Sequence, residues 1–159
     1  MRIRPLTIEY QPFLWKALYH AIYVPPGDAE PPPEIVNEPG IRRYAVDWMK
    51  NQDDIGCVAI EDEVPIGAAW LRCWSGDEQG YGFVDEDVPE LSMALLPGYR
   101  GKGIGTKLLR HLLAEAEKRY AAISLSVSES NPARRLYERE GFKVFGNPEG
   151  GSIIMVKRF

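Results

Sequence analysis

A glycine-rich segment in the second half of the chain has the composition of a phosphate-binding loop. It reads Arg100-Gly101-Lys102-Gly103-Ile104-Gly105. Glycine accepts a positive φ and lets a ligand approach the backbone closely. The segment leads into a stretch with helical periodicity, and a helix N-terminus offers free N–H groups and a favourable dipole to an anion. With its two cations, the segment predicts a phosphate cradle and not merely a connecting turn.

The segment fits two other nucleotide-binding motifs poorly. A P-loop needs Lys-Ser/Thr directly after its last glycine, whereas Ile104-Gly105 follows Gly103 here. A Rossmann fingerprint needs glycines close behind a strand and an acid about 20 residues further on. Glu129 provides such an acid, but residues 97–100 separate the glycines from the predicted strand. A small nucleotide-binding module therefore stays open as a third hypothesis.

The hydrophobic pattern predicts the elements that position this loop. Strands are expected at residues 2–6, 55–61, 65–74, 88–96, 121–127, 142–145 and 152–157. Helices are expected at 12–23, 39–50, 104–120 and 131–140. The prolines of 24–33 predict a surface loop or lid, and Asp62-Glu63 predicts a hairpin turn. This order predicts an α/β (α+β) fold with a mixed sheet of about seven strands flanked by about four helices.

Composition narrows the class of protein. The 159 residues, 45% hydrophobic and 26% charged, predict one globular domain over 1–159. A net charge of −4 leaves no basic footprint for a nucleic-acid partner. Cys57, Cys73, His20 and His111 match no zinc spacing, so no metal site is expected. No apolar run approaches the ~20 residues of a membrane span and no signal peptide is evident, which predicts a cytoplasmic protein without membrane contact.

Two motifs together resemble the signatures of the GNAT family of acyltransferases. Arg100-x-x-Gly103-x-Gly105 matches the family pattern Arg/Gln-x-x-Gly-x-Gly/Ala. Residues 131–142, Asn-Pro-Ala-Arg-Arg-Leu-Tyr-Glu-Arg-Glu-Gly-Phe, resemble the second signature, a helix that carries Leu-Tyr and ends in Gly-Phe. The resemblance covers residues 88–145. It implies the GNAT fold and direct transfer of an acetyl group from acetyl-CoA to a primary amine.

The resemblance also implies where the donor binds. The pyrophosphate would lie in the glycine loop, at Arg100, Gly101, Lys102, Gly103, Ile104 and Gly105. The pantetheine arm would pair with strand backbone, at Met93, Ala94 and Leu95. Many family members carry a cofactor-binding asparagine at the position of Ser130. Here Asn131 or Ser130 takes that role, or either residue simply caps the following helix.

Two catalytic side chains follow from the same resemblance. Tyr137 matches a tyrosine that faces the sulfur and acts as general acid; the alternative is a tyrosine that only packs on the sheet. A lysine-like amine, with a pKa near ~10.4, is only about one part in a thousand neutral at pH 7, so a base assists its attack. Glu90 is the candidate base. The neighbouring acids 85–87 would attract a cationic acceptor, or they form an ordinary solvated loop.

The acceptor itself stays open: a small amine, an amino acid, an antibiotic or a protein amine. Aromatic residues that would line its site are Tyr19, Tyr23, Trp48, Trp70 and Trp74, although such residues more often fill cores. The resemblance also allows for a homodimer. As an alternative function, the same fold would serve as a non-catalytic acyl-CoA sensor.

Overall fold

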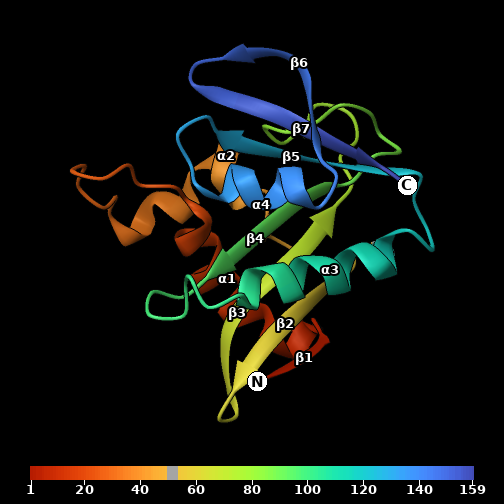
Figure 1. The fold of residues 1–159 in the computed structure, drawn as a ribbon. Helices are drawn as coiled ribbons and strands as arrows, with labels where there is room; N and C mark the ends of the chain where they lie inside the picture. Colours follow the sequence, from red (N-terminus) through yellow and green to blue (C-terminus); the bar gives the residue numbers. More distant parts are fainter. Residues whose placement is uncertain (50–53) are drawn as a thin grey trace.

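The computed structural model describes residues 1–49 and 54–159, with the backbone alone at 147–149. One mixed sheet runs through it in the order β1-β2-β3-β4-β5-β7-β6 (Figure 1). Its strands are β1 (Arg2–Pro5), β2 (Gly56–Glu61), β3 (Val64–Arg72), β4 (Glu90–Leu95), β5 (Ala122–Ser128), β6 (Lys143–Glu149) and β7 (Ser152–Arg158). All neighbours pair antiparallel except β4 and β5, which are parallel. The predicted mixed seven-stranded sheet is confirmed.

Helices cover both faces of this sheet. On one face lie α1 (Gln11–Ala21) and α2 (Pro39–Arg42), with the short 3-10 turns η1 (Ile8–Tyr10) and η2 (Pro33–Asn37). On the other lie α3 (Ile104–Ala116), which crosses in front of β2 and β3 in Figure 1, and α4 (Ala133–Arg139). Each face buries its own apolar cluster, because alternate residues of a strand point to opposite sides. In β2, Cys57 belongs to the α3 cluster and Val58 to the α1 cluster.

The predicted hairpin turn agrees with the structure, and other predicted elements need adjustment at their ends. Asp62 and Glu63 adopt φ values of 50° and 64°, as a tight two-residue turn between β2 and β3 requires. The α3 helix ends at Ala116 instead of residue 120, and β6 extends to Glu149 instead of residue 145.

The helix predicted over residues 39–50 is wrong for most of its length. Only α2 (Pro39–Arg42) is helical, and residues 43–49 form successive turns; the predicted end at Lys50 lies outside the described residues. Asp47 and Met49 have φ values of 54° and 75°, which no right-handed helix contains. Three apolar residues of this segment are nevertheless buried, since Tyr44, Ala45 and Trp48 are at most 7% exposed.

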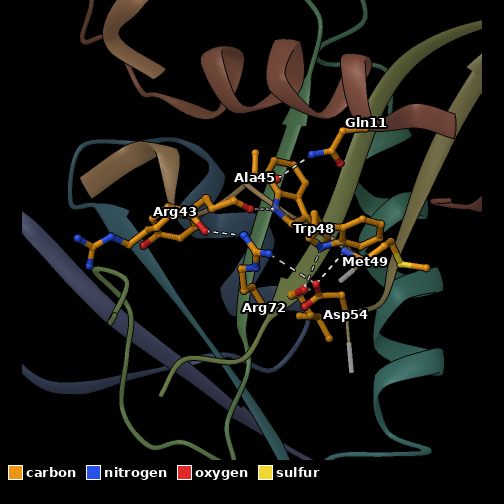
Figure 2. A network of polar contacts seen from close by, with 10 residues as sticks. Gln11, Arg43, Ala45, Trp48, Met49, Asp54 and Arg72 are labelled. Atoms are coloured by element: carbon orange, nitrogen blue, oxygen red, sulfur yellow. Dashed lines mark hydrogen bonds and ion pairs between the residues drawn. The ribbon is translucent and has the colours of Figure 1, made fainter. Parts of the chain in front are cut away.

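Core side chains replace the missing helical hydrogen bonds (Figure 2). Arg72 Nη1 donates to the Arg43 carbonyl at 2.7 Å, and Trp70 Nε1 donates to that of Tyr44 at 2.9 Å. Gln11 Nε2 donates to the Ala45 carbonyl at 3.1 Å. The carbonyls of Arg43 and Tyr44 thus have partners that a helix would otherwise supply, and that of Ala45, which also accepts the Trp48 N–H at 3.2 Å, has a second one. Periodicity alone cannot reveal such partners, because they come from distant parts of the chain.

Asp54 belongs to the same network of polar contacts. Its carboxylate accepts the Met49 N–H at 2.9 Å and lies 3.7 Å from Arg72 Nη2, with both side chains nearly buried (Figure 2). We expect Asp54→Ala to lower the free energy of unfolding by about 2 kcal/mol, because it removes the acceptor of the partly buried Met49 N–H and the charge partner of the nearly buried Arg72, which keeps its bond to Arg43. Urea denaturation measures this. Lys118→Ala, which removes an exposed pair with Glu115, is the control and should cost about 0–1 kcal/mol; equal losses would contradict the structural role.

Candidate active site

β4 and β5 separate after a single residue pair. Glu90 pairs with Ser124, whose N–H donates to the Pro89 carbonyl at 3.0 Å. Beyond this pair the two strands run apart, as Figure 1 shows. The sheet therefore contains a gap with its closed end at Glu90 and Ser124, although β4 stays paired with β3 along its whole length.

The register with β3 determines which backbone groups face this gap. Leu96 N–H donates to the Ile66 carbonyl at 2.9 Å, and hydrogen-bonded pairs alternate along an antiparallel ladder. Ala94 therefore directs its N–H and C=O toward β3, whereas Met93 and Leu95 direct theirs into the gap. Of the three strand residues predicted to pair with the donor, Met93 and Leu95 thus have backbone groups that face the gap, whereas those of Ala94 face β3.

The gap opens into a cavity of about 1200 Å³ that joins the two faces of the sheet. It is bounded by β4, β5, the glycine loop, the start of α4 and the segment after α1. Ten of the twelve predicted site residues line it: Glu90, Met93, Ala94, Leu95, Arg100, Gly101, Gly103, Gly105, Asn131 and Tyr137. Lys102 and Ile104 do not. Lys102 lies over the Tyr99 ring, and the Ile104 side chain is buried in the core.

The glycine loop has the backbone form that was expected of it. Gly98, Gly101 and Gly103 have φ values of 93°, 74° and 81°, and a Cβ at any of them would meet open space. Gly103 is the N-cap of α3, and the first helical bond of that helix runs from Lys107 N–H to the Gly103 carbonyl. The N–H groups of residues 104–106 consequently have no acceptor in the helix. These features fit a phosphate group.

Arg100 connects the loop to its surroundings. Its Nε donates to the Leu95 carbonyl and its Nη2 to the His20 carbonyl, both at 3.3 Å. The guanidinium therefore lies between β4 and the end of α1, beside the cavity. Burial, helped by Arg100 and Lys16, lowers the pKa of His20 below its usual value. His20 is accordingly neutral near pH 7, and Arg100 carries the positive charge here.

Tyr137 reaches the cavity from α4, on the α3 side of the sheet. Its ring packs edge-on against Phe142, with centroids 5.8 Å apart, and is 8% exposed. No described residue forms a hydrogen bond with its hydroxyl. Burial raises the pKa of Tyr137 to about 12, so the group keeps its proton at neutral pH. An unpartnered phenol at a cavity wall is available to donate to a ligand atom.

Glu90 belongs to the opposite face. Leu91 packs in the α3 cluster, so its neighbour Glu90 points toward α1 and α2. Its Oε2 accepts the Tyr44 hydroxyl at 2.7 Å, and its Oε1 accepts Trp74 Nε1 at 3.0 Å and Gly82 N–H at 3.1 Å. Burial raises the pKa of Glu90 to about 7, although the three donors oppose this shift. A carboxylate with that pKa suits a base working near neutral pH.

Two glycines let a loop cover this carboxylate. A Cβ at Gly82 would lie 2.9 Å from Glu90 Cδ and 2.8 Å from the Leu125 carbonyl carbon. A Cβ at Gly80 would collide with Glu90 Oε1 and with the Tyr44 hydroxyl. The absence of a Cβ at these two positions is what lets the loop of residues 75–82 lie against Glu90.

Asn131 has a structural role at the start of α4. Its Oδ1 accepts the Ala133 N–H at 2.9 Å, which is a helix-capping contact. Ser130 instead offers its carbonyl to the Tyr23 hydroxyl at 3.2 Å, across the cavity mouth. Asn131, just before the N-cap of α4, Pro132, thus contacts the backbone at the start of the helix and also lines the cavity.

The sequence analysis did not single out Tyr44, which lines the cavity and binds Glu90. Among the five aromatic candidates for the acceptor site, Tyr19 and Tyr23 line the cavity and Trp74 holds Glu90. Trp48 and Trp70 are core residues whose indole N–H groups bind backbone carbonyls. The signal that would have found Tyr44 is its long-range pairing with Glu90, which no local pattern contains.

Within the part of the chain that the structure describes, no helix is long and apolar enough to cross a bilayer. No cluster of His, Cys, Asp or Glu suited to a metal ion is found among the same residues.

Comparison with known proteins identifies the family. The model of the acetyltransferase (GNAT) family matches residues 15–142. An uncharacterized N-acetyltransferase, YsnE of Bacillus subtilis (strain 168), is 39% identical over 118 residues, which is 69% of this chain and 76% of the relative.

Solved structures agree on the fold. The paia N-acetyltransferase of Thermoplasma acidophilum, in complex with coenzyme A, is 23% identical with a TM-score of 0.67, and all of both chains is covered. The yncA protein of Salmonella typhimurium, with its cofactor acetyl-CoA, is 22% identical with a TM-score of 0.69, covering 99% of this chain and 93% of that one. The family match spans most of the chain and includes both signature regions. This chain therefore belongs to the GNAT family of N-acetyltransferases.

Proposed function

We propose that this GNAT N-acetyltransferase transfers an acetyl group from acetyl-CoA directly to a primary amine, with Glu90 as general base and Tyr137 as general acid. The observation that carries the proposal is the gap between β4 and β5. It has a phosphate cradle at its open end, and the two candidate groups reach it from opposite faces of the sheet. Bound acetyl-CoA would supply the thioester carbonyl that the amine attacks.

The residues present fit this donor. The open N–H and C=O groups of Met93 and the N–H of Leu95 offer the hydrogen bonds of an added strand to the amides of the pantetheine arm. The free N–H groups of 104–106 and the Arg100 guanidinium suit a pyrophosphate. Gly101 and Gly103 leave the space that phosphate oxygens would need.

The two catalytic groups divide the proton transfers. As the N–C bond forms and the C–S bond breaks, Glu90 receives the proton that the amine loses. Tyr137 donates to the sulfur that leaves. Its pKa of about 12 lies above that of an ordinary thiol, near ~8.5, so its main contribution is a hydrogen bond while the C–S bond breaks. The proton that Glu90 gained then leaves to solvent, and the released thiolate of coenzyme A takes a proton from solvent, so Tyr137 keeps its own.

The cavity wall on the α1 side supports a cationic acceptor. Asp28 and Glu30 lie in the segment after α1. The rings of Tyr44 and Tyr81 stack with centroids 6.4 Å apart, and the Tyr44 hydroxyl binds Glu90. Carboxylates attract an ammonium group over long distances, and aromatic faces stabilise it at contact.

Release of free thiol from acetyl-CoA tests this function, measured with small amines, amino acids and short peptides. We expect turnover with at least one cationic primary amine. Calorimetry measures donor binding separately. Absence of coenzyme A binding would overturn the proposal, whereas binding without turnover on any amine would favour an acyl-CoA sensor.

Gly103→Ala tests the phosphate cradle. An alanine at a φ of 81° is strained by roughly 1–2 kcal/mol, and relief of that strain turns the loop N–H groups away from the phosphate. We expect the Kd for coenzyme A to rise about tenfold, which corresponds to about 1.4 kcal/mol. Isothermal titration calorimetry measures the change.

Gly76→Ala provides the matched control. Gly76 has a φ of 63° and equally open surroundings, but it does not line the cavity. The same strain should leave coenzyme A affinity as in the wild type. Equal losses in both variants would show that Gly103 acts through overall stability and not through the cradle.

A further inference from the structure

The Glu90 carboxylate is poorly placed to touch an acceptor directly. Its side chain belongs to a residue only 3% exposed, and both oxygens already accept hydrogen bonds. The loop of residues 75–82 covers it so closely that a Cβ at Gly80 or Gly82 would collide with the Glu90 side chain. A base in this setting needs an intermediary between itself and the amine.

The donors to Glu90 differ in whether they can give up a proton. Trp74 contributes an indole N–H and Gly82 a backbone amide, and neither is acidic enough to transfer its proton in catalysis. Tyr44 contributes a hydroxyl, at 2.7 Å, which can transfer one proton while accepting another. Among the described residues it is the one donor to this carboxylate that is capable of a relay.

The hydroxyl of Tyr44 also has capacity for the acceptor. A phenol oxygen has one proton and two lone pairs. Its proton is directed to Glu90, and one lone pair accepts the Tyr81 N–H at 2.7 Å. The second lone pair has no partner among the described residues, and Tyr44 lines the cavity.

We propose that Tyr44 is a catalytic residue of this enzyme, whose hydroxyl takes the proton of the acceptor amine as it passes its own proton to Glu90. The inference rests on the proposed function of Glu90 as base. The amine N–H bond and the Tyr44 O–H bond break together, and new O–H bonds form on Tyr44 and on Glu90. The amine loses one proton, Glu90 gains one, and Tyr44 is neutral before and after.

The surroundings of Tyr44 favour this concerted route over a free tyrosinate. Burial and the adjacent Glu90 raise the pKa of Tyr44 well above its usual value, so it cannot hold a negative charge near neutral pH. Among the described residues, the titratable group that faces Tyr44 and Glu90 is Tyr81, which lies on the covering loop and stacks on the Tyr44 ring. The charge therefore has to remain on Glu90.

Tyr44→Phe separates a relay from a positioning role. In either role, loss of the hydrogen bond raises the pKa of Glu90 above about 7, and a titration of ¹³C-labelled glutamate side chains by NMR, without donor, measures that pKa in both proteins. Rates are then compared at a pH at least one unit above the higher value and below the acceptor pKa. A relay predicts that kcat stays at least about tenfold lower there, with the acceptor KM little changed.

Each outcome bears on one claim. Recovery of kcat to the wild-type value at that pH would overturn the relay and leave Tyr44 a positioning residue. Unchanged activity of Glu90→Gln would instead overturn the base role on which the relay rests. Tyr10→Phe is the matched control, because Tyr10 packs against the same apolar cluster but does not line the cavity; it should retain activity.

A measurement on the unaltered protein covers the case in which Tyr44→Phe fails to fold. Single-turnover rates in mixtures of H₂O and D₂O depend on how many protons move in the rate-limiting step. Two protons moving together predict a curved dependence on the deuterium fraction, whereas a linear dependence would contradict the relay.

Discussion

Glu90→Gln is expected to lower kcat about 1000-fold, within the range that general-base catalysis contributes. The substitution keeps the shape of the side chain. Its amide nitrogen can donate to the Tyr44 hydroxyl, and its oxygen can still accept from Trp74 and Gly82. The loss should therefore reflect the missing base and not a collapsed site.

The pH profile gives this prediction its specificity. Burial raises the pKa of Glu90 to about 7, so the wild-type rate should rise with pH through that value as the carboxylate ionises. The variant should lack this limb. A glutamine variant with wild-type rates, or one that keeps an inflection near pH 7, would assign the base elsewhere.

Stability supplies an independent control on the same variant. The folded pKa of Glu90 lies above the usual carboxyl value, so the unfolded chain releases this proton more easily. The wild type should therefore lose stability relative to Glu90→Gln as pH rises from about 4.5 to about 7. Thermal melts at pH 5 and pH 8 measure the difference, and a pH-independent difference would contradict the raised pKa.

Tyr137→Phe is the second large effect that we expect, with kcat lowered about 100-fold through loss of the donor to the leaving sulfur. The phenyl ring keeps its edge-on contact with Phe142, and no described residue loses a hydrogen bond. Coenzyme A affinity and thermal stability should both stay close to those of the wild type. Stopped-flow measurement of thiol release separates this step from product release.

The leaving group provides the control for Tyr137. An acetyl thioester with a more acidic thiol needs less help at the sulfur, so the penalty of Tyr137→Phe should shrink with such a donor. A penalty that does not depend on the thiol would assign Tyr137 a packing role. Reduced coenzyme A affinity in the variant would point to the same conclusion.

Elements of this chain that depend on residues close together in the sequence could be predicted, and those that depend on distant residues could not. Leu108 and Leu112 of α3 repeat at helical spacing, and the alternation of Leu91 and Met93 marks β4, so local patterns located both. The glycine loop was predictable because Gly101 and Gly103 meet a backbone requirement that is visible in their own type. These signals located the elements to which the proposed function assigns donor binding.

The acceptor half depends on contacts between distant segments. Tyr44 lies in a stretch with helical periodicity that forms turns and not a helix. Arg72 and Trp70 donate hydrogen bonds to backbone carbonyls of this stretch. Its hydroxyl reaches Glu90 across 46 positions of the chain. Tertiary contacts here overrule the local preference, and no window of sequence contains both partners.

The single residue pair that joins β4 to β5 gives Glu90 a structural role in addition to its proposed chemical one. Among the described residues, the two halves of the sheet, β1–β4 and β5–β7–β6, pair with each other only where Glu90 lies opposite Ser124. Glu90 therefore lies at the junction of the two halves, at the closed end of the gap, where Tyr44, Trp74 and Gly82 hold its carboxylate. The same residue thus joins the two halves of the sheet and carries the proposed base.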